Sequence, residues 1–262
     1  MPGSVDTGGG LYLEPALYDV VNTPGTAAEL TALGRVVRGH RGRGPHRWLE
    51  PACGSGRYLR SLRARGHQVA GYDPLEGMLA YARRRLSRWT DGWALAQADF
   101  TTPAVALAGL GAFDVAFCPV NSLRHLPDDA SVAAHLAQVR GLLAPGGLYV
   151  VGLDLLRPDA LPDEDVWTGS RGRLRVHEVM QYLPPDDGGR TEQVVVQMMV
   201  TRPRGTTHHG WAYGLRTYTD LQWSALVRHA GWRRVATHDS AGRAVAAGTP
   251  LAYQLEVLQP DR

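Results

Sequence analysis

The sequence contains no lysine, only two cysteines and no long apolar run. All 28 basic residues are arginine, which we attribute to the coding bias of GC-rich DNA and not to mechanism. Cys53 and Cys118 are too few for a disulfide framework, or for a zinc site without histidine help. No apolar stretch approaches the roughly 20 residues that cross a bilayer, and the start MPGSVDTGGG lacks the parts of a signal peptide. We therefore expect a soluble cytoplasmic protein with no membrane partner and no bound metal.

The charge balance gives little support to a nucleic-acid partner. The formal net charge is only +3, and the one local basic cluster is RGHRGRGPHR at 38–47. This cluster could meet phosphates, but it has no interleaved aromatic side chain for base stacking. A solvated linker before the first strand is the simpler interpretation, so we expect no nucleic-acid binding. The alternative predicts an affinity that falls steeply with salt.

Length and hydrophobic patterning predict an α/β protein. A chain of 262 residues with 44% hydrophobic content can bury a full core, as one domain with an elaboration or as two compact lobes. The segments LYLEPALYDVVN and TAAELTALGRVVRG predict one or two helices before that core. From residue 47 onward short apolar strands alternate with helical patterns, which indicates a doubly wound, mostly parallel sheet. The predicted strands are 47–52, 68–72, 94–98, 113–118 and 147–153, and the predicted helices are 57–65, 75–89 and 128–143.

Residues 155–213 break this alternation. LRVHEVMQYL and TEQVVVQMMVTR are period-2 or apolar runs joined by PPDDGG, and WAYGLRTY follows as a third run. We therefore expect a small antiparallel sheet inserted into the main domain. The chain then returns to a helix capped by Thr219 or Asp220 and ending at Gly231, followed by strands near 232–238 and 251–258.

Residues 48–59, WLEPACGSGRYL, predict a ligand-binding loop between a strand and a helix. Gly54 and Gly56 can adopt a positive φ and have no Cβ to hold a ligand away, and the following helix offers its first N–H groups. Asp73 ends the next strand, 17 residues beyond Gly56, where a carboxylate can accept hydrogen bonds from both hydroxyls of a ribose. A dinucleotide fingerprint fits poorly, because its third glycine would fall on Leu59.

The pattern acid-x-small-x-Gly-x-Gly over Glu50–Gly56 resembles motif I of the class I S-adenosylmethionine-dependent methyltransferases, with Asp73 matching their ribose-binding acid. Ala52 stands where the family usually has glycine, which is a mild change. The resemblance implies a seven-stranded, mostly parallel sheet whose last strand is antiparallel. It also implies a division of the chain into an N-terminal helical cap or lid (1–44), a cofactor-binding domain (45–154 and 217–262) and an inserted antiparallel sheet that forms the acceptor pocket (155–216).

The same resemblance implies where S-adenosylmethionine binds. The acid and the next residue of AQADF would lie beside adenine, which are Asp99 and Phe100, and Met78 would cover the other adenine face. An ordinary turn acid at 99, a core methionine at 78 and small buried thiols at both cysteines are the structural alternatives. The full expected cofactor set is Glu50, Ala52, Cys53, Gly54, Gly56, Tyr58, Asp73, Pro74, Met78, Asp99, Phe100, Cys118 and Asn121.

The segment after the fourth strand, CPVNSLRHL, lacks the Asn/Asp-Pro-Pro-aromatic motif of base-directed amino methyltransferases. It looks like small-molecule methyltransferases, including those that modify natural-product sugars and amines. His125 is the leading candidate for a general base or for acceptor positioning, with a structural histidine as the alternative. Tyr12 and Tyr18 are candidates to close over the methyl group. We expect the acceptor to contact His177, Trp211, Tyr213 and Arg216.

Together these features predict methyl transfer from S-adenosylmethionine to a nitrogen or oxygen atom of a small metabolite, in secondary metabolism. The alternative keeps the fold and the cofactor without methylation, for another alkyl transfer, a rearrangement, or structural or regulatory use. A homodimer is compatible with the sequence.

Overall fold

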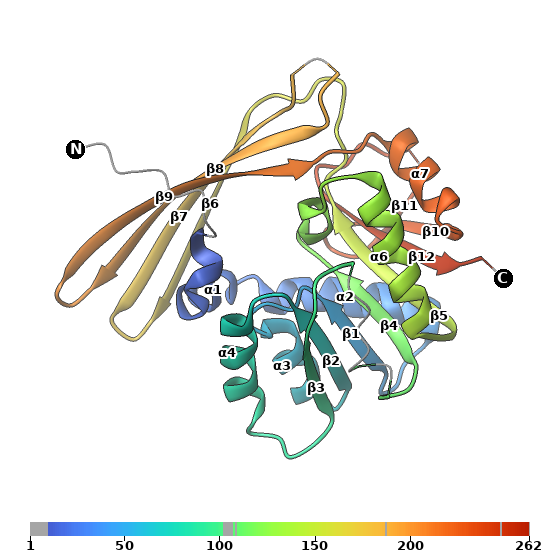
Figure 1. Ribbon diagram of the computed structural model, residues 1–262, viewed down its shortest axis with the longest axis horizontal. Coiled ribbons are helices and arrows are strands. Elements are labelled where there is room, and N and C mark those ends of the chain that lie inside the picture. The colour runs from blue at the N-terminus through green and yellow to red at the C-terminus, as the bar shows by residue number, and fades with distance from the viewer. Residues whose placement is uncertain (1–9, 102–106, 108, 187, 247, 262) are drawn as a thin grey trace.

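An eight-stranded sheet lies at the centre of the computed structural model, which describes residues 10–101, 107, 109–186, 188–246 and 248–261 (Figure 1). The strand order is β11-β10-β12-β5-β4-β1-β2-β3. The pairs among β1 to β5 are parallel, and β12 runs antiparallel between β5 and β10. The strands are β1 (Arg47–Pro51), β2 (Gln68–Asp73), β3 (Trp93–Gln97), β4 (Phe113–Cys118), β5 (Leu143–Leu153), β10 (Trp232–Asp239), β11 (Ala244–Val245) and β12 (Gln254–Pro260).

This sheet confirms the predicted α/β fold, with one strand more than expected. The additional strand is β11, which has two residues and pairs only with the edge strand β10. So short a segment has no hydrophobic periodicity that the sequence could reveal.

Helices cover both faces of the sheet, as a doubly wound fold requires. The helices α2 (Thr26–Arg41), α3 (Arg57–Ala64) and α4 (Glu76–Leu86) share one hydrophobic cluster with the sheet. The helices α6 (Asp129–Leu142) and α7 (Asp220–His229) share the cluster on the other face. The predicted helix at 75–89 ends earlier, at Leu86, while the helix at 219–231 begins with a capping box between Thr219 and Gln222.

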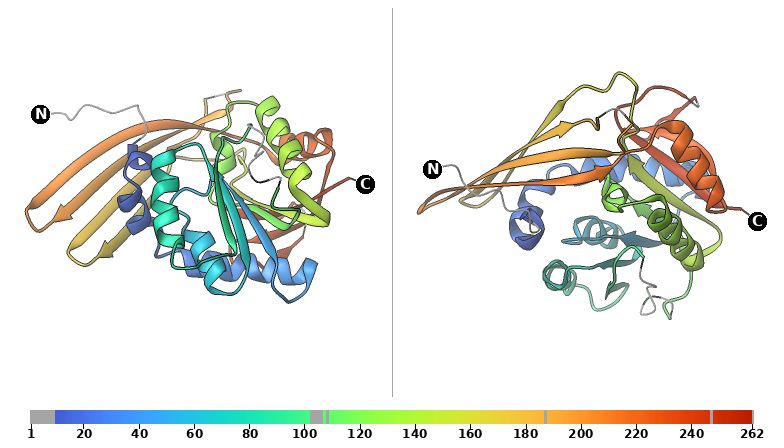
Figure 2. Two further views of the ribbon diagram at one scale, coloured as in Figure 1. Left: turned by 60° about the horizontal axis from the view of Figure 1, so that its bottom comes forward. Right: turned by 45° about the horizontal axis from the view of Figure 1, so that its top comes forward.

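A second, four-stranded antiparallel sheet stands beside the first and is ordered β6-β7-β8-β9 (Figures 1 and 2). Its strands are β6 (Asp163–Arg171), β7 (Leu174–Leu183), β8 (Thr191–Arg202) and β9 (Gly205–Arg216). Three of them match the runs predicted from the sequence. The first, β6, was not predicted, because its side chains are mostly exposed and lack an apolar alternation.

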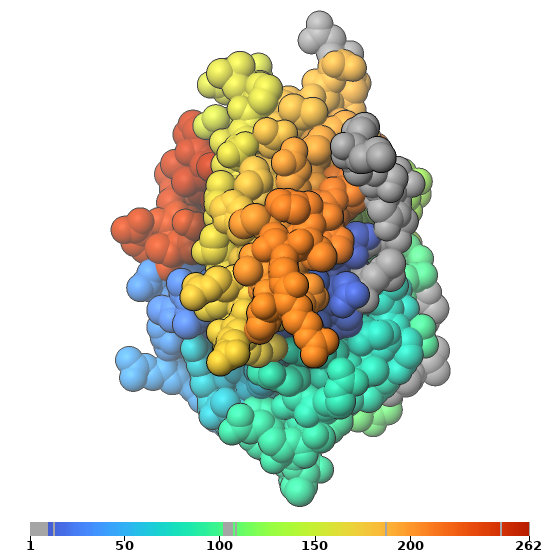
Figure 3. All heavy atoms as spheres, turned by 90° about the vertical axis from the view of Figure 1, so that its left-hand side faces the viewer, coloured from blue at the N-terminus to red at the C-terminus, as the bar shows by residue number. Residues whose placement is uncertain are grey.

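The N-terminal segment packs against the second sheet. The 3-10 helix η1 (Gly10–Leu13) and helix α1 (Pro15–Asn22) contribute Leu11, Leu17, Val20 and Val21 to a third hydrophobic cluster with β7, β8 and β9. Helix α1 also contacts β6 and α4. The backbones of α1 and β6 meet so closely that a Cβ on Gly169 would lie 1.9 Å from the carbonyl oxygen of Val20. Seen from the side, the four-stranded sheet (yellow to orange) forms the upper part of this face of the molecule, above the teal segment that includes α4 (Figure 3).

Both cysteines are buried and free. Among the described residues, every helix is too short or too polar to cross a lipid bilayer.

Candidate active site

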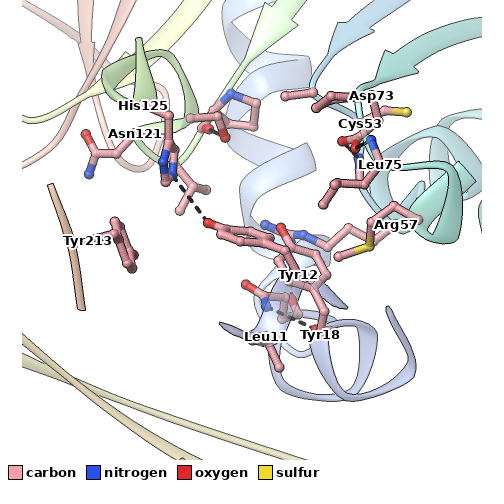
Figure 4. A pocket seen from close by; sticks show the side chains of 18 of the residues that line it. Leu11, Tyr12, Tyr18, Cys53, Arg57, Asp73, Leu75, Asn121, His125 and Tyr213 are labelled. Carbon is pink, nitrogen blue, oxygen red and sulfur yellow. Dashed lines mark hydrogen bonds between the residues drawn. The ribbon is translucent and has the colours of Figure 1, made fainter. Parts of the chain in front are cut away.

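A cavity of about 350 Å³ opens where the carboxyl ends of the parallel strands face the second sheet (Figure 4). One wall comes from the loops after β1, β2, β3 and β4, and the opposite wall comes from β6 to β9. Tyr12 and Tyr18 from the N-terminal segment line it as well. Open α/β sheets bind ligands at this edge, so the position matches the expected site.

The glycine loop has the backbone conformation that its sequence predicts. Ala52, Gly54 and Gly56 all have positive φ, at 51°, 50° and 69°. Gly54 and Ala52 line the cavity, whereas Gly56 lies behind the loop and caps α3. A Cβ on Gly56 would lie 3.1 Å from the Cβ of Ala82, so this glycine permits close packing of α3 on α4.

Asp73 ties the glycine loop to the end of β2. The backbone N–H groups of Gly54 and Leu75 donate to its two carboxylate oxygens, at 2.8 and 2.9 Å. Burial raises the pKa of Asp73, and these two donors offset part of that effect. Each oxygen can still accept a further hydrogen bond from a ligand hydroxyl.

Glu50 is a buried acid at the end of β1 and needs a positive partner. Its side chain is 3% exposed, and its Oε2 has no hydrogen-bond partner among the described residues. Burial raises its pKa well above the usual value, and the nearby Arg57 only partly counteracts this. A cationic group of a ligand in the cavity would compensate the buried carboxyl.

The far end of the same wall is apolar. Met78 and Phe100 line it, together with Pro74 and Asp99. Asp99 accepts hydrogen bonds from the backbone and the hydroxyl of Thr101, at 2.8 and 3.0 Å. This combination of an apolar slot and an acid suits a flat, polar ring.

The turn after β4 holds two consecutive non-glycine residues with positive φ, Val120 (53°) and Asn121 (60°). The N–H of Val120 donates to the Tyr253 hydroxyl at 3.0 Å. The Asn121 side chain donates to the Asp154 carboxylate at 2.7 Å and accepts from the Asp154 N–H at 2.9 Å. These bonds hold a strained turn that leads directly into the 3-10 helix η2 (Ser122–His125).

His125, at the end of η2, faces Tyr12 and Tyr213 across the cavity (Figure 4). The Tyr12 hydroxyl lies 3.3 Å from His125 Nε2, and the Tyr213 ring stacks on the imidazole at 5.3 Å between centroids. Burial, and secondarily the charge of Arg124, lower the pKa of His125 to about 4. The ring is therefore neutral near pH 7, which leaves one nitrogen able to accept a proton.

The two N-terminal tyrosines stay protonated. Burial raises the pKa of Tyr18 to about 12 and the pKa of Tyr12 well above its usual value. The Tyr18 ring lies against the glycine loop, where a Cβ on Gly54 would be 3.6 Å from its ring edge. Its centroid is 5.8 Å from that of Tyr12.

Four of the catalytic, cofactor-binding and acceptor-binding residues predicted from the sequence lie outside the cavity. Gly56 and Cys118 are packed behind it, the latter in the core cluster between sheet and helices. Arg216 instead pairs with Asp129, at 2.9 and 3.1 Å. His177 lies on β7 between the inward-facing Val176 and Glu178, so strand alternation turns it to the opposite face. The remaining members of the predicted sets line the cavity, among them Glu50, Cys53, Tyr58, Trp211 and Tyr213.

The structure adds cavity residues that the sequence did not single out. The inner face of the second sheet presents Glu178 and Met180 beside Trp211 and Tyr213, and beside Trp167 and Tyr182, two aromatic residues of the insertion whose type also suits a pocket. The sequence contains a pattern that could have revealed them. In LRVHEVMQYL every second residue lies on the same face of the strand, and that face carries Val176, Glu178, Met180 and Tyr182. An acid on the apolar parity of a strand marks a buried polar group.

Residues 49–147 match the family model described as a methyltransferase domain. The match covers the segment from β1 to the start of β5, including the glycine loop, and shows that this part of the chain is similar to methyltransferase domains. The cavity has the features that S-adenosylmethionine would require: Asp73 would suit the ribose hydroxyls, the slot of Met78 and Phe100 would suit adenine, and the unpartnered Glu50 would suit a positive charge.

Among curated relatives, the rat (Rattus norvegicus) glycine N-methyltransferase is 31% identical over 122 residues. That match covers 42% of this chain and 41% of the relative, so the chain matches only about two fifths of the length of the glycine N-methyltransferases. A longer match, 27% identical over 232 residues, is to dTDP-3-amino-3,6-dideoxy-alpha-D-glucopyranose N,N-dimethyltransferase of Streptomyces fradiae. It covers 86% of this chain and 84% of that enzyme.

Solved structures share the fold across the whole chain. The sugar N-methyltransferase KedS8 from Streptoalloteichus sp ATCC 53650 superposes with a TM-score of 0.73 at 21% identity, covering 100% of this chain and 99% of that one. An S-adenosylmethionine-dependent methyltransferase from Clostridium acetobutylicum gives 0.71 at 14% identity, covering 90% and 92%.

Proposed function

We propose that the protein transfers a methyl group from S-adenosylmethionine to a nitrogen atom of a small amine, with amino sugars as the first class to test. The observation that carries the proposal is the neutral His125, held between Tyr12 and Tyr213 in the cavity that also contains the glycine loop. The Streptomyces fradiae relative, named for N,N-dimethylation of an amino sugar, supports this substrate class. Oxygen is the less favoured acceptor atom.

S-adenosylmethionine supplies a methyl group that is already activated on a sulfonium. The acceptor nitrogen uses its lone pair to form the new C–N bond, while the electron pair of the broken C–S bond stays on sulfur. Alignment and partial desolvation can therefore provide most of the rate effect, with effective molarities on the order of 10⁵ to 10⁸ M for well-oriented reactants.

In this proposal His125 takes the proton that the acceptor nitrogen must lose. A pKa of about 4 makes the imidazole a weak base but keeps it unprotonated and available, and the Tyr12 hydroxyl orients the ring. Tyr12 and Tyr18 line the cavity, and their rings would exclude water from the methyl group.

Calorimetry with S-adenosylmethionine tests the cofactor part. We expect Asp73→Ala to weaken binding by about tenfold or more, because it removes a charged acceptor for the ribose hydroxyls and frees the Gly54 loop. The matched control is Asp159→Ala, which removes an exposed carboxylate whose only ion pair among the described residues is with Arg157. Undiminished binding by Asp73→Ala would contradict this cofactor site.

Transfer itself is tested with methyl-labelled cofactor and a panel of amino sugars, each paired with its hydroxyl analogue. We expect label on nitrogen. Cofactor binding without label in any product would favour the alternative of a non-methylating use, and label on the hydroxyl analogues alone would favour an oxygen acceptor.

A further inference from the structure

Glu178 is a buried carboxyl in the cavity wall that has no hydrogen bond or ion pair to any residue in the described part of the chain. Its side chain is only 3% exposed. It projects from β7 between Val176 and Met180, on the face that lines the cavity. A carboxyl buried without a partner is costly, so its retention calls for a ligand that compensates it.

The surroundings of Glu178 are apolar and aromatic. Trp167 on β6 and Met198 on β8 are its neighbours across the sheet. Burial, with no other cause, raises the pKa of Glu178 to about 7. Trp167 also lines the cavity, and aromatic rings attract cations through their electron-rich faces. An acid in an aromatic wall forms a site for an organic cation.

Glu178 also lies near the groups proposed for methyl transfer. Its charge helps to raise the pKa of Tyr12 and of Tyr213, although burial is the larger cause in both. The Tyr12 phenol feels Asp73 as well, so it is within electrostatic reach of both the glycine loop and Glu178. A group bound to Glu178 therefore shares the cavity with His125, which contacts both tyrosines.

The charges along the described cavity lining also favour a positively charged ligand. Four carboxyl groups line it, and the single guanidinium, Arg57, is paired with Glu29. The lining acids are Glu50, Asp73, Asp99 and Glu178. With Glu50 and Asp73 facing the cofactor, Glu178 is the acid of the opposite wall.

We propose that Glu178 is the acceptor-recognition residue, and that the acceptor is an amine which enters the cavity as an ammonium ion and binds the Glu178 carboxylate among Trp167, Tyr182 and Tyr213. Before transfer the carboxylate takes one proton from the ammonium, which gives the nitrogen the lone pair that attacks the methyl group; the proton lost after the C–N bond forms goes to His125. The inference rests on the proposed function and narrows its substrate to amines that are protonated at neutral pH. An analogue with a hydroxyl in place of the ammonium leaves the buried carboxylate unpaired, so the site discriminates against it.

Binding of cyclohexylamine and cyclohexanol in the presence of S-adenosylhomocysteine tests the proposal, because the two probes differ only in the group that Glu178 would meet. At pH 8, where the amine is protonated and Glu178 is ionised, we expect Glu178→Gln to weaken cyclohexylammonium by about 30-fold in calorimetry. Affinity for cyclohexanol and for S-adenosylhomocysteine should change less than about twofold.

Glu164→Gln is the matched control, since Glu164 is an exposed acid on β6 of the same sheet and its side chain bonds only to Gln181 among the described residues. A Glu178→Met variant checks folding, and its melting temperature should be no lower than that of the wild type. Equal cyclohexylammonium affinity in the wild type and Glu178→Gln, or none in the wild type, overturns the proposal.

The two hypotheses fail in different ways. If Glu178→Gln transfers label to amines with unchanged KM, the recognition role is wrong and methyl transfer stands. If cyclohexylammonium binding depends on Glu178 but no amine accepts label, the cation site stands and the proposed function is wrong.

Discussion

His125 is held by aromatic contacts on two sides and is neutral at physiological pH. If it accepts the proton of the acceptor nitrogen, His125→Asn should lower kcat by about 100-fold and change KM little. His208→Asn, an exposed histidine on β9, should leave both constants unchanged. Steady-state kinetics with an amino-sugar acceptor measure the split.

The lowered pKa of His125 also fixes the pH dependence. A folded-state pKa of about 4 keeps the ring neutral at every pH above about 5, so kcat should show no loss from this residue between pH 8 and 5. We expect kcat to decline only below pH 5, where His125 becomes protonated. A wild-type inflection near pH 6.5 that disappears in His125→Asn would contradict the lowered pKa.

Ala52 has a φ of 51° at the place where the resembling family has glycine. An L-residue in this conformation costs about 1 to 2 kcal/mol, while glycine loses roughly 0.5 to 1 kcal/mol of chain entropy. Ala52→Gly should therefore keep or raise the free energy of unfolding, by up to about 1.5 kcal/mol, without weakening cofactor binding. Ala52→Val should lower it. Urea unfolding measures this free energy for both variants. If Ala52→Gly lowers the free energy of unfolding by more than about 1 kcal/mol, Ala52 is not strained in the wild type.

The residue scale also shows what the sequence could and could not predict. The cavity wall around the glycine loop was predictable because Glu50, Gly54 and Asp73 belong to a local motif at strand ends. The acceptor wall was chosen by chemical type, and His177 and Arg216 proved to point elsewhere. Which face of a strand is buried depends on its pairing with distant segments. The alternation of side chains along β7, which places Glu178 on the same face as Val176 and Met180, was therefore a better guide than residue type.

At the scale of elements, the turn from β4 into η2 determines where His125 lies. Asn121 satisfies the Asp154 carboxylate and N–H at once. Asn121→Ala should lower the free energy of unfolding by about 2 kcal/mol and lower kcat as well, because the strained turn loses its support. Ser122→Ala, whose hydroxyl bonds only to the Pro119 carbonyl among the described residues, is the control. If the wild type and Asn121→Ala are equally stable, the hydrogen bond from Val120 to Tyr253 is enough to hold the turn.

Helices and strands with a clear apolar period were predicted nearly to their ends, as in β4 (113–118) and α7. The segments that were missed are stabilised by pairing and not by burial. Strand β6 is mostly exposed and is ordered by its hydrogen bonds to β7, and the first half of β9 is polar. Their positions follow from the neighbouring strand, which no local window of sequence contains.

At the scale of the whole molecule, Asp19 joins the N-terminal helix to both sheets. This fully buried carboxylate accepts hydrogen bonds from Arg171 on β6 at 2.5 Å, Tyr81 on α4 at 3.0 Å and Ser55 of the glycine loop at 3.2 Å. Burial alone would raise its pKa, but Arg171, Arg60 and Tyr81 together outweigh that effect and lower it. The carboxylate is thus ionised and stabilising.

Asp19→Asn should lower the free energy of unfolding by about 3 kcal/mol, because it leaves buried cations uncompensated. Since the folded-state pKa is lowered, the stabilisation is complete above about pH 4 and is lost as the pH falls through the folded value. The difference between wild type and variant should therefore shrink below pH 4. The exposed control Asp159→Asn should have the same free energy of unfolding as the wild type at every pH. A difference between wild type and Asp19→Asn that does not change with pH would contradict an ionised Asp19.

The contact between Gly169 and the carbonyl of Val20 has a consequence for the order of events in a turnover. Because there is no room for a side chain between α1 and β6, we expect the two segments to move together when the cavity opens. Tyr18 on α1 touches the glycine loop and Trp167 on β6 lines the acceptor wall, so one movement uncovers both ends of the cavity. We expect a singly methylated acceptor to leave whenever the spent cofactor is exchanged, which makes successive methylations distributive. Release of monomethyl product before dimethyl product in a time course would agree, and direct formation of the dimethyl product would not.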